Sequence, residues 1–327
     1  MTTKRPGKFS LASRAPLATK QFASYRRELL KRLDGTIKPV PVPWTSLSDC
    51  LHGGLWPKTC TVVNGATGAG KTSFAVAIAS HAAKHGVPAV YLSLELDGEE
   101  MAARLFAIEA GVPWSSLLYG GSRDSLDAAT EMALVARKKE WPLLVMTQDH
   151  RRLKYEEVGH YVAALRKKYA SRLADSDGEL NQPCLLVVDY IQLLDTDEDR
   201  MDVRARVGAA ATYLRAVARD QHAAVLVVSS VSRAHYDRLT GHGGGGFKLG
   251  RGDPAMLLAS AKESGDLEYS ADNVLVLAVD RSGVASVDGH TAWVGVAKAR
   301  WGTPQPWAEL RFKDGAFREA PTMRDLK

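Results

Sequence analysis

The sequence predicts an α/β domain with a mostly parallel β-sheet and helices on both faces. Short apolar runs alternate with helical segments from residue 60 onward. The runs are continuously apolar, which is typical of parallel strands whose two faces are both covered. Two later runs, 273–280 and 291–300, are joined by a polar turn that contains glycine. We expect both of them to be antiparallel additions at the C-terminal side.

The expected strands and helices follow one another along the chain. The apolar runs expected to form parallel strands are 60–65, 89–96, 142–147, 184–190 and 224–230. The segments expected to form helices are 73–86, 98–110, 124–139, 155–171 and 203–220. A further segment, 234–254, is too rich in glycine for a packed core, so we expect a loop there.

The first 44 residues are expected to form a basic arm that ends in a short amphipathic helix, at about residues 21–34. The apolar side chains at helical spacing are Phe22, Tyr25, Leu29, Leu30 and Leu33, and Gly35 gives a stop signal. This apolar stripe either packs on its own domain or docks on a neighbouring subunit, and the sequence leaves both open. Prolines over 38–44 predict an extended linker. The main domain is expected over 45–320, with a tail at 321–327.

The composition is that of an ordinary globular protein. Of the 327 residues, 45% are hydrophobic and 24% are charged, which excludes a disordered or fibrous chain. The apolar runs are well below the roughly 18–20 residues that cross a bilayer, and we identify no signal peptide. Three cysteines, Cys50, Cys60 and Cys184, show no metal-ligand spacing. We therefore expect a cytoplasmic protein with no membrane segment.

The net charge of +6 is unevenly distributed. Residues 1–44 carry ten Lys and Arg against two acidic residues, whereas the rest of the chain holds 33 basic and 35 acidic residues. The positive excess therefore lies in the arm, which could contact phosphates. The charge of the main domain gives little support for DNA binding.

The stretch GATGAGKT fits the phosphate-loop pattern G-x-x-x-x-G-K-[ST] between an expected strand and an expected helix. Its glycines let backbone N–H groups converge on phosphate oxygens, and the helix start adds the positive end of its dipole. Lys71 is expected to reach the β- and γ-phosphates, and Thr72 to hold Mg²⁺. The predicted nucleotide-binding residues of the loop are Gly65, Ala66, Thr67, Gly68, Ala69, Gly70, Lys71 and Thr72.

A second acidic site supports the nucleotide prediction. Asp189 ends the buried run CLLVVD, where a carboxylate can hold the hydration shell of Mg²⁺. The next residue is Tyr190, although many phosphate-loop ATPases carry their general base at that place. Glu95, at the end of AVYLSLE, is the best candidate for this base. If its strand is next to the phosphate-loop strand, its carboxylate would face the γ-phosphate and orient the attacking water.

These pieces in this order resemble the RecA-like ATPase domain of the DnaB-type bacterial replicative helicases. The resemblance covers roughly residues 45–318 and implies a RecA-like P-loop NTPase fold. It depends on the tracts SLSDCLHGGLWPKTCTVVNGATGAGKTSFAVAIA, VYLSLELDGEEMAARL, LLVVDYIQLLD, VLVVSSVSR, AKESGDLEYSADNVLVL and VAKARWG. DYIQLL and KESGDLEYSAD are more specific than the phosphate loop, because ATPases in general lack them.

The resemblance implies a role for several further residues. Glu95 matches the catalytic glutamate, and Lys71, Thr72 and Asp189 match the residues that bind ATP and Mg²⁺. The tract 298–300 matches basic residues, here Lys298 and Arg300, that reach the γ-phosphate of the nucleotide bound by the adjacent subunit. By spacing alone, these two point to the same face of a strand. The loop that tracks the backbone of single-stranded DNA is matched by Lys262, Glu263, Ser264 and Gly265.

Three departures from the family pattern stand out. Ser230 occupies the place where family members usually carry a glutamine that senses the γ-phosphate. The family's globular N-terminal domain is not seen before the ATPase domain, although the helix at about 21–34 matches the linker helix that docks on the next subunit. Segment 234–254 is longer and richer in glycine than expected, and could be a second channel loop or an attachment point for another protein.

The function implied is that of an ATP-dependent ring, expected to be a homohexamer, that translocates on single-stranded DNA and unwinds duplex. Two alternatives remain open. The first is a RecA- or KaiC-like ATPase that assembles on DNA or scaffolds partners without unwinding, which the missing N-terminal domain and Ser230 favour. The second is an accessory helicase that needs a loader or another replication protein.

Overall fold

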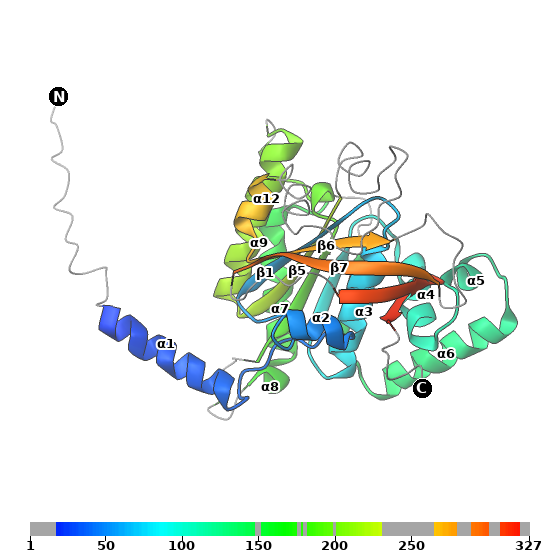
Figure 1. Ribbon diagram of the computed structural model, residues 1–327, viewed down its shortest axis with the longest axis horizontal. Helices are drawn as coiled ribbons and strands as arrows, with labels where there is room; N and C mark the ends of the chain where they lie inside the picture. The colour runs from blue at the N-terminus through cyan, green and yellow to red at the C-terminus, as the bar shows by residue number, and fades with distance from the viewer. Residues whose placement is uncertain are drawn as a thin grey trace.

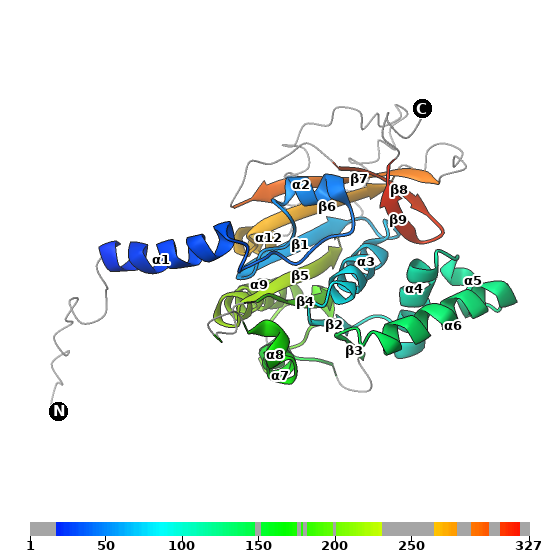
Figure 2. The same cartoon turned by 90° about the horizontal axis from the view of Figure 1, so that it is seen from below.

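A sheet of nine strands lies at the centre of the described part of the chain, in the order β3-β2-β4-β5-β1-β6-β7-β8-β9 (Figures 1 and 2). The structure, a computed structural model, describes residues 18–147, 152–174, 178, 182–198, 201–230, 265–279, 289–300 and 308–320. The strands are β1 (Thr59–Gly65), β2 (Ala89–Ser93), β3 (Leu143–Thr147), β4 (Cys184–Asp189), β5 (Ala223–Ser230), β6 (Asn273–Val279), β7 (His290–Ala299), β8 (Ala308–Lys313) and β9 (Ala316–Glu319).

The strands from β3 to β6 in this order run parallel, and β7, β8 and β9 follow as antiparallel neighbours. The predicted mostly parallel sheet with antiparallel C-terminal strands is confirmed. The prediction that the run 273–280 is itself an antiparallel addition is wrong, because β6 pairs with β1 in parallel and is antiparallel only to β7. A short turn makes the two strands that it joins antiparallel to each other. It does not determine the direction of the strand that pairs with the other edge of either one.

Helices cover both faces of the sheet, as predicted (Figure 1). Adjacent residues of a strand point to opposite faces, so Val63 packs with α3 and α4 whereas Val62 packs with α7 and α9. The helices are α1 (Ala18–Leu33), α2 (Thr45–Cys50), α3 (Lys71–Lys84), α4 (Gly98–Ala110), α5 (Trp114–Leu118), α6 (Arg123–Lys138), α7 (Val158–Lys168), α8 (Ala170–Leu173), α9 (Val203–Asp220) and α12 (Gly265–Ser270). Two 3₁₀ turns, η2 (Tyr155–Glu157) and η3 (Ile191–Leu193), complete the described elements.

Helices α4 and α9 begin and end where the sequence predicts. The Asp97 side chain accepts a hydrogen bond from the Glu100 N–H at 2.8 Å, and the Asp202 side chain accepts one from the Ala205 N–H at 2.7 Å. Both aspartates therefore satisfy N–H groups that the first turn of a helix leaves without a partner. Gly111 ends α4 in a left-handed conformation, which glycine adopts without strain.

The short elements that were not predicted include α2, α5, β8 and β9. Each has only four to six residues, too few to show a clear apolar period. In β8, buried and exposed side chains are mixed rather than continuously apolar. Two of these elements, α5 and β8, matter for function, because they line the pocket described below together with the turn between β8 and β9.

Helix α1 projects away from the body in both views (Figures 1 and 2). None of its residues is buried, and Phe22 and Leu33 are 64% and 75% exposed. Contact with the body is made near its C-terminal end, where Glu28 pairs with Lys58 at 2.7 Å. Although partial burial raises the pKa of Glu28, hydrogen bonds from Lys58 and Arg32 hold it below its usual value. The apolar stripe of α1 therefore does not pack on its own domain.

The expected linker at 38–44 is part of the body. Val40 pairs with Leu55 through two backbone hydrogen bonds, of 2.8 and 2.9 Å. Trp44 is buried and its ring stacks on that of Phe74 at a centroid distance of 4.6 Å. Because Ile37 is buried as well, packing of the body begins several residues before the predicted boundary at 44/45.

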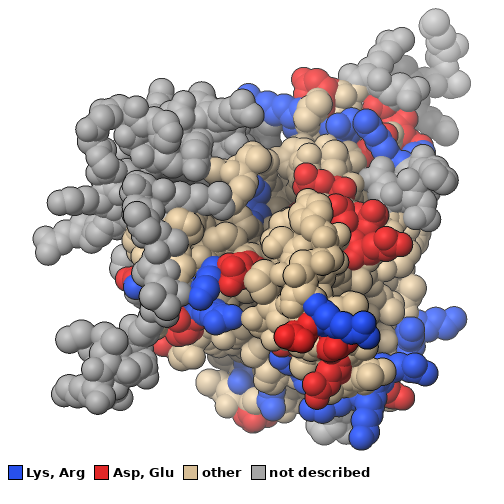
Figure 3. Space-filling model, turned by 90° about the vertical axis from the view of Figure 1, so that its right-hand side faces the viewer, with Lys and Arg blue, Asp and Glu red and all other residues tan. Residues whose placement is uncertain are grey.

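The surface shows no large-scale separation of charge on the face that Figure 3 presents. Lys and Arg side chains and Asp and Glu side chains are both scattered over it. This agrees with the near balance of charge outside residues 1–44. In the ranges that the structure describes, no helix combines the length and apolar character needed to span a bilayer.

Candidate nucleotide-binding site

The phosphate loop connects the end of β1 to the start of α3, as predicted. Gly70 precedes α3 with φ +83°. It has no side chain that could cap the helix, so the first N–H groups of α3 are left for a ligand at the loop. A Cβ at Gly70 would lie 2.9 Å from the rings of both Phe312 and Phe317. Glycine is therefore required here for conformation and for space. The result is a helix N-terminus suited to an anion.

The Lys71 ammonium lies over the loop, where Nζ donates to the carbonyl oxygens of Gly65 and Ala66, both at 2.8 Å. Burial lowers the pKa of Lys71 to about 8, while the carboxylates of Asp189 and Glu95 oppose the shift. At neutral pH the side chain is still mostly a cation. It thus brings a positive charge to the position where phosphate oxygens would meet the loop.

Asp189 ends β4 and is buried beside the start of α3. Its Oδ2 accepts a 2.6 Å hydrogen bond from the hydroxyl of Tyr91, which comes from β2. Burial raises the pKa of Asp189, and hydrogen bonds from Tyr91 and Thr72 oppose the shift. A hydroxyl and a carboxylate in contact are the hard oxygen donors that Mg²⁺ prefers. Thr72 and Asp189 therefore fit the predicted metal site.

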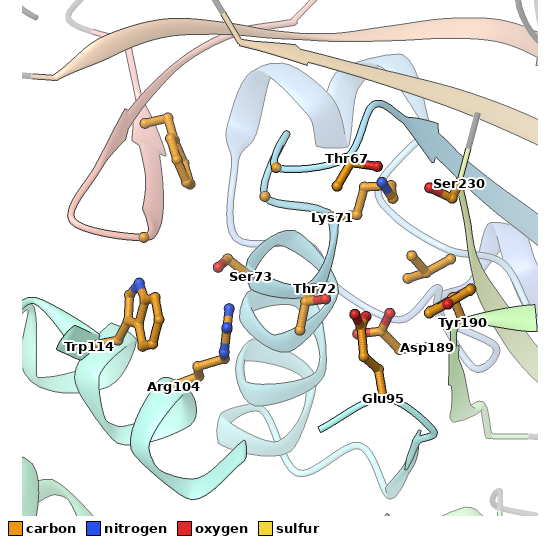
Figure 4. Close-up of a pocket in the computed structure, with 15 residues that line it drawn as sticks. Thr67, Lys71, Thr72, Ser73, Glu95, Arg104, Trp114, Asp189, Tyr190 and Ser230 are labelled. Atoms are coloured by element: carbon orange, nitrogen blue, oxygen red, sulfur yellow. The ribbon is translucent and has the colours of Figure 1, made fainter. Parts of the chain in front are cut away.

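Glu95 lies just beyond β2, and its carboxylate is beside that of Asp189 (Figure 4). One premise of the prediction was wrong: β2 is not next to β1, because β4 and β5 lie between them. Glu95 reaches the same pocket as Lys71 because it stands two residues past the strand, at the carboxyl edge that all the parallel strands share. That edge is where α/β sheets generally bind their ligands.

These residues line a cavity of about 500 Å³. At the end away from Ser230, the cavity is lined by Arg104, Trp114, Phe312 and Gly315, which the sequence analysis missed. The guanidinium of Arg104 stacks on the Trp114 ring, 4.3 Å from its centroid (Figure 4). The sequence held one signal for Arg104, its place in α4, because that helix directly follows the catalytic candidate Glu95. Nothing in the sequence showed that Trp114 would reach the same cavity.

Ser230 ends β5 and lines the cavity at the end that also holds Lys71, as its predicted role requires (Figure 4). A glutamine does approach this strand end, from a different position. The Gln192 amide in η3 donates to Ser229 Oγ at 2.9 Å and to the Ser230 carbonyl at 3.4 Å. Gln192 therefore ties the turn after Asp189 to the end of β5.

Lys298 and Arg300 lie far from this cavity. Lys298 is opposite Val274 at the start of β6, three residues before Leu277, which pairs with the phosphate-loop residue Gly65. At a rise of about 3.3 Å per residue this is about 10 Å along the strands. In both views α12, which leads into β6, lies at the opposite end of the body from α4 and α5 (Figures 1 and 2).

Arg300 stands beyond the end of β7, whose register shifts near Lys298. The shift lies between Val296 and Lys298, so it does not separate Lys298 from Arg300, and the expectation that the two side chains share one strand face stays a prediction. Lys298 Nζ donates to the Tyr269 carbonyl at 3.5 Å, and the Arg300 guanidinium pairs with Asp272 at 2.7 Å. The DNA-loop residues Lys262, Glu263 and Ser264 and the segment 234–254 lie outside the described residues. Gly265 begins α12.

Comparison with known proteins gives a consistent result. Residues 40–318 match the family model described as the DnaB-like helicase C-terminal domain. The chain is 27% identical over 252 residues to the replicative DNA helicase DnaB of Leifsonia xyli subsp. xyli, covering 76% of this chain and 49% of that protein. It is 25% identical over 311 residues to that of Pasteurella multocida, covering 92% of this chain and 60% of that protein. The chain thus spans about half the length of these curated relatives.

Solved structures support the fold. A DnaB-like replicative helicase, described with its interactions with primase, superposes with a TM-score of 0.72 at 18% identity, over 94% of this chain and 67% of that one. An isolated ATPase domain superposes with a TM-score of 0.74 at 18% identity, over 94% of this chain and all of that one. With a family match that covers most of the described body, the sequence resemblance is confirmed, and the chain belongs to the DnaB-like helicase C-terminal domain family.

Proposed function

We propose that this protein is an ATP-driven DNA helicase that forms a ring of identical subunits, translocates on single-stranded DNA and unwinds duplex. The observation that carries the proposal is the separation of two sets of residues within one chain. Lys71, Asp189 and Glu95 share the cavity at the carboxyl ends of the parallel strands, whereas Lys298 and Arg300 lie at the amino ends. A site that uses both sets needs two copies in head-to-tail contact, and such contacts form a ring where the rotation between copies closes.

The cavity residues supply the cis part of the proposed reaction. Lys71 and the N–H groups at the start of α3 bind the phosphates of ATP. Mg²⁺ held through Thr72 and Asp189 would supply neutralisation of the charge that develops on the phosphates. Glu95 orients a water molecule toward the γ-phosphate and accepts its proton. The neighbouring subunit's Arg300 then stabilises the transition state from the other side.

Two other parts of the chain complete the proposed ring. The exposed apolar stripe of α1, within the proposed arm at 1–44, docks on the next copy and buries the side chains that its own domain leaves exposed. The loop that ends at Gly265 faces single-stranded DNA in the channel and contacts its backbone, so DNA affinity should fall steeply with salt. By family resemblance the ring has six subunits.

Further partners are also proposals. One structural neighbour is described with its interactions with primase, and a primase, a helicase loader or another replication protein are the partners that we propose for this chain. We place the assembly in the cytoplasm, where its three free cysteines remain reduced.

A forked duplex with a 5′ single-stranded tail tests the proposal. With ATP and Mg²⁺ the wild-type protein is expected to displace one strand, and Lys71→Ala is expected to be inactive because it loses the phosphate contact. Hydrolysis of ATP without strand displacement, with or without added partners, would contradict helicase function.

One observation favours a second candidate, an ATPase that assembles on DNA or scaffolds partners without unwinding. The strand end that should carry a γ-phosphate sensor has the short Ser230, and the nearby Gln192 amide is engaged by Ser229 and Ser230. Hydrolysis could then be weakly coupled to movement. This candidate predicts ATP-dependent assembly on DNA and an intact fork.

A further inference from the structure

We propose that Asp272 is the positioning residue that holds Arg300 at the subunit boundary, ready to meet the nucleotide of the neighbouring copy. The inference rests on the proposed function, because it assumes that Arg300 acts in trans. It assigns a role to a carboxylate that lies outside the nucleotide cavity. Asp272 joins α12 to β6 at the amino ends of the parallel strands.

The contacts of Asp272 fix its side chain from several directions. Oδ1 accepts from Nη1 of Arg300 at 2.7 Å, and Oδ2 accepts from the N–H of Cys60 in β1 at 3.0 Å. The Arg300 N–H also donates to the Asp272 carbonyl at 2.9 Å. Both the guanidinium and the backbone of Arg300 are therefore tied to one residue, and that residue is tied to the central strand of the sheet.

Burial makes this ion pair more than a surface contact. The Asp272 side chain is 2% exposed, whereas that of Arg300 is 39% exposed. A second guanidinium, that of Arg215 from α9, lies 3.4 Å from the same Oδ1. Only the carboxylate of this pair is buried, so salt screens the interaction less than it screens a pair in which both groups are exposed. Arg215 supplies a second positive charge to the same buried oxygen.

The geometry of the guanidinium explains how holding Arg300 in one position can aid catalysis. A guanidinium has five N–H groups in a fixed plane. The ion pair with Asp272 engages Nη1, and the Arg300 side chain as a whole remains partly exposed, so other N–H groups of the fork can meet a ligand. An arginine fixed at one edge loses less side-chain entropy when it binds a phosphate. Asp272 should therefore raise turnover without affecting how its own subunit binds ATP.

The substitution Asp272→Asn tests this inference. It keeps the shape but places an amide where the carboxylate accepts from Arg300. We expect kcat for ATP to fall about 10- to 100-fold, as for other residues that orient a reacting group, with ADP affinity and KM nearly unchanged. Capture of aluminium fluoride with ADP, which mimics the transition state, should be lost as well. Unchanged or increased turnover would overturn the inference, and an increase would indicate that Asp272 restrains Arg300.

Mixed assemblies separate a trans effect from a local structural one. Glu95→Gln chains lack the cis base but keep Asp272 and Arg300. When they are mixed in equal amounts with Asp272→Asn chains, about one interface in four combines an intact cis site with an intact trans edge. ATPase activity should then rise well above that of either variant alone. Mixtures that show no recovery would overturn the inference.

The mixture of Glu95→Gln with Arg300→Gln chains tests the proposed function separately. If this mixture recovers activity and the Asp272→Asn mixture does not, Arg300 acts in trans and the role of Asp272 is wrong. If neither recovers, the trans role of Arg300 itself fails.

Two controls address folding. Arg215→Met removes the second guanidinium that pairs with Asp272 and is expected to lower the melting temperature but to retain most of kcat. Equal losses of kcat in Arg215→Met and Asp272→Asn would show that Asp272 only stabilises the fold. If Asp272→Asn fails to fold, the smaller neutral substitution Asp272→Ser replaces it.

Discussion

The hydroxyl of Tyr91 donates a 2.6 Å hydrogen bond to Oδ2 of Asp189, and both side chains are buried. The bond crosses from β2 to its neighbour β4. Because one carboxylate oxygen is committed to Tyr91, the orientation of the other is fixed as well. Tyr91 therefore sets the geometry of the residue that we propose to hold Mg²⁺.

Tyr91→Phe should raise the Mg²⁺ concentration needed for half-maximal ATPase activity several-fold, because Asp189 loses a donor that fixes its carboxylate. The loss of one bond to a buried carboxylate should also lower the free energy of unfolding by roughly 1.5–3 kcal/mol. Tyr213→Phe is the matched control, since Tyr213 donates to the Glu156 carbonyl at 2.8 Å, outside the cavity. An Mg²⁺ titration that is the same for Tyr91→Phe and Tyr213→Phe would contradict the assignment.

Gly315→Ala should disturb the end of the cavity formed by Trp114. Gly315 has φ +80°, and a Cβ there would lie 2.3 Å from Cδ1 of Trp114. Gly120→Ala separates strain from collision, since Gly120 has φ +70° with nothing within 4 Å of a Cβ. Both should lose about 1 kcal/mol from the backbone conformation. Only Gly315→Ala should lose further stability and bind ATP more weakly, as measured by melting and by fluorescent-nucleotide titration. Equal effects would show that the contact with Trp114 is unimportant.

The stability of the fold should depend on His81 at mildly acidic pH. Burial lowers the pKa of His81 to about 4, with His85 and Lys84 adding to the shift and Glu109 opposing it. The unfolded chain takes up this proton near pH 6.5, so stability is lost as the pH falls from about 6.5 toward 4. His81→Gln should flatten part of this fall in melting temperature. Melting temperatures of the wild-type protein and of His81→Gln over this pH range check the effect, and equal pH profiles for the two proteins would contradict it.

The stripe of α1 should control assembly without affecting the fold of the subunit. Phe22 is largely exposed, so Phe22→Asp removes no packing from its own domain. We expect it to reduce the assembly to smaller species in light scattering while the melting temperature of the dilute subunit is unchanged. Ser24→Asp adds the same charge to the opposite side of the helix and should leave the assembly intact. Full-size assemblies of Phe22→Asp would rule out docking through this stripe.

Local signals predicted the parts of this protein that depend on neighbours in sequence. The caps Asp97 and Asp202 stand directly before α4 and α9, and the phosphate loop is one continuous stretch. The order of strands is not local, and the assumption that β2 is next to β1 failed for that reason. The pair of Asp272 with Arg300 depends on the register between β6 and β7 and on a shift within it.

The wall of the cavity was equally hard to predict. Trp114 and Gly315 are about two hundred residues apart in sequence and meet only because β8 and β9 extend the sheet beyond β7. Those strands are short and have mixed polarity, so their apolar pattern gave no warning. The residues of the site that sequence analysis found are those with a chemical motif, and those it missed, apart from the charged Arg104, act through shape.

The central claim is that ATP is hydrolysed at a boundary between two copies, each of which supplies only part of the catalytic site. The most direct test measures ATP turnover per chain over a wide range of protein concentration, with the mass of the species determined on the same samples. The account predicts that turnover per chain falls with dilution in step with the loss of assemblies. A monomer that hydrolyses ATP at the full rate would contradict it.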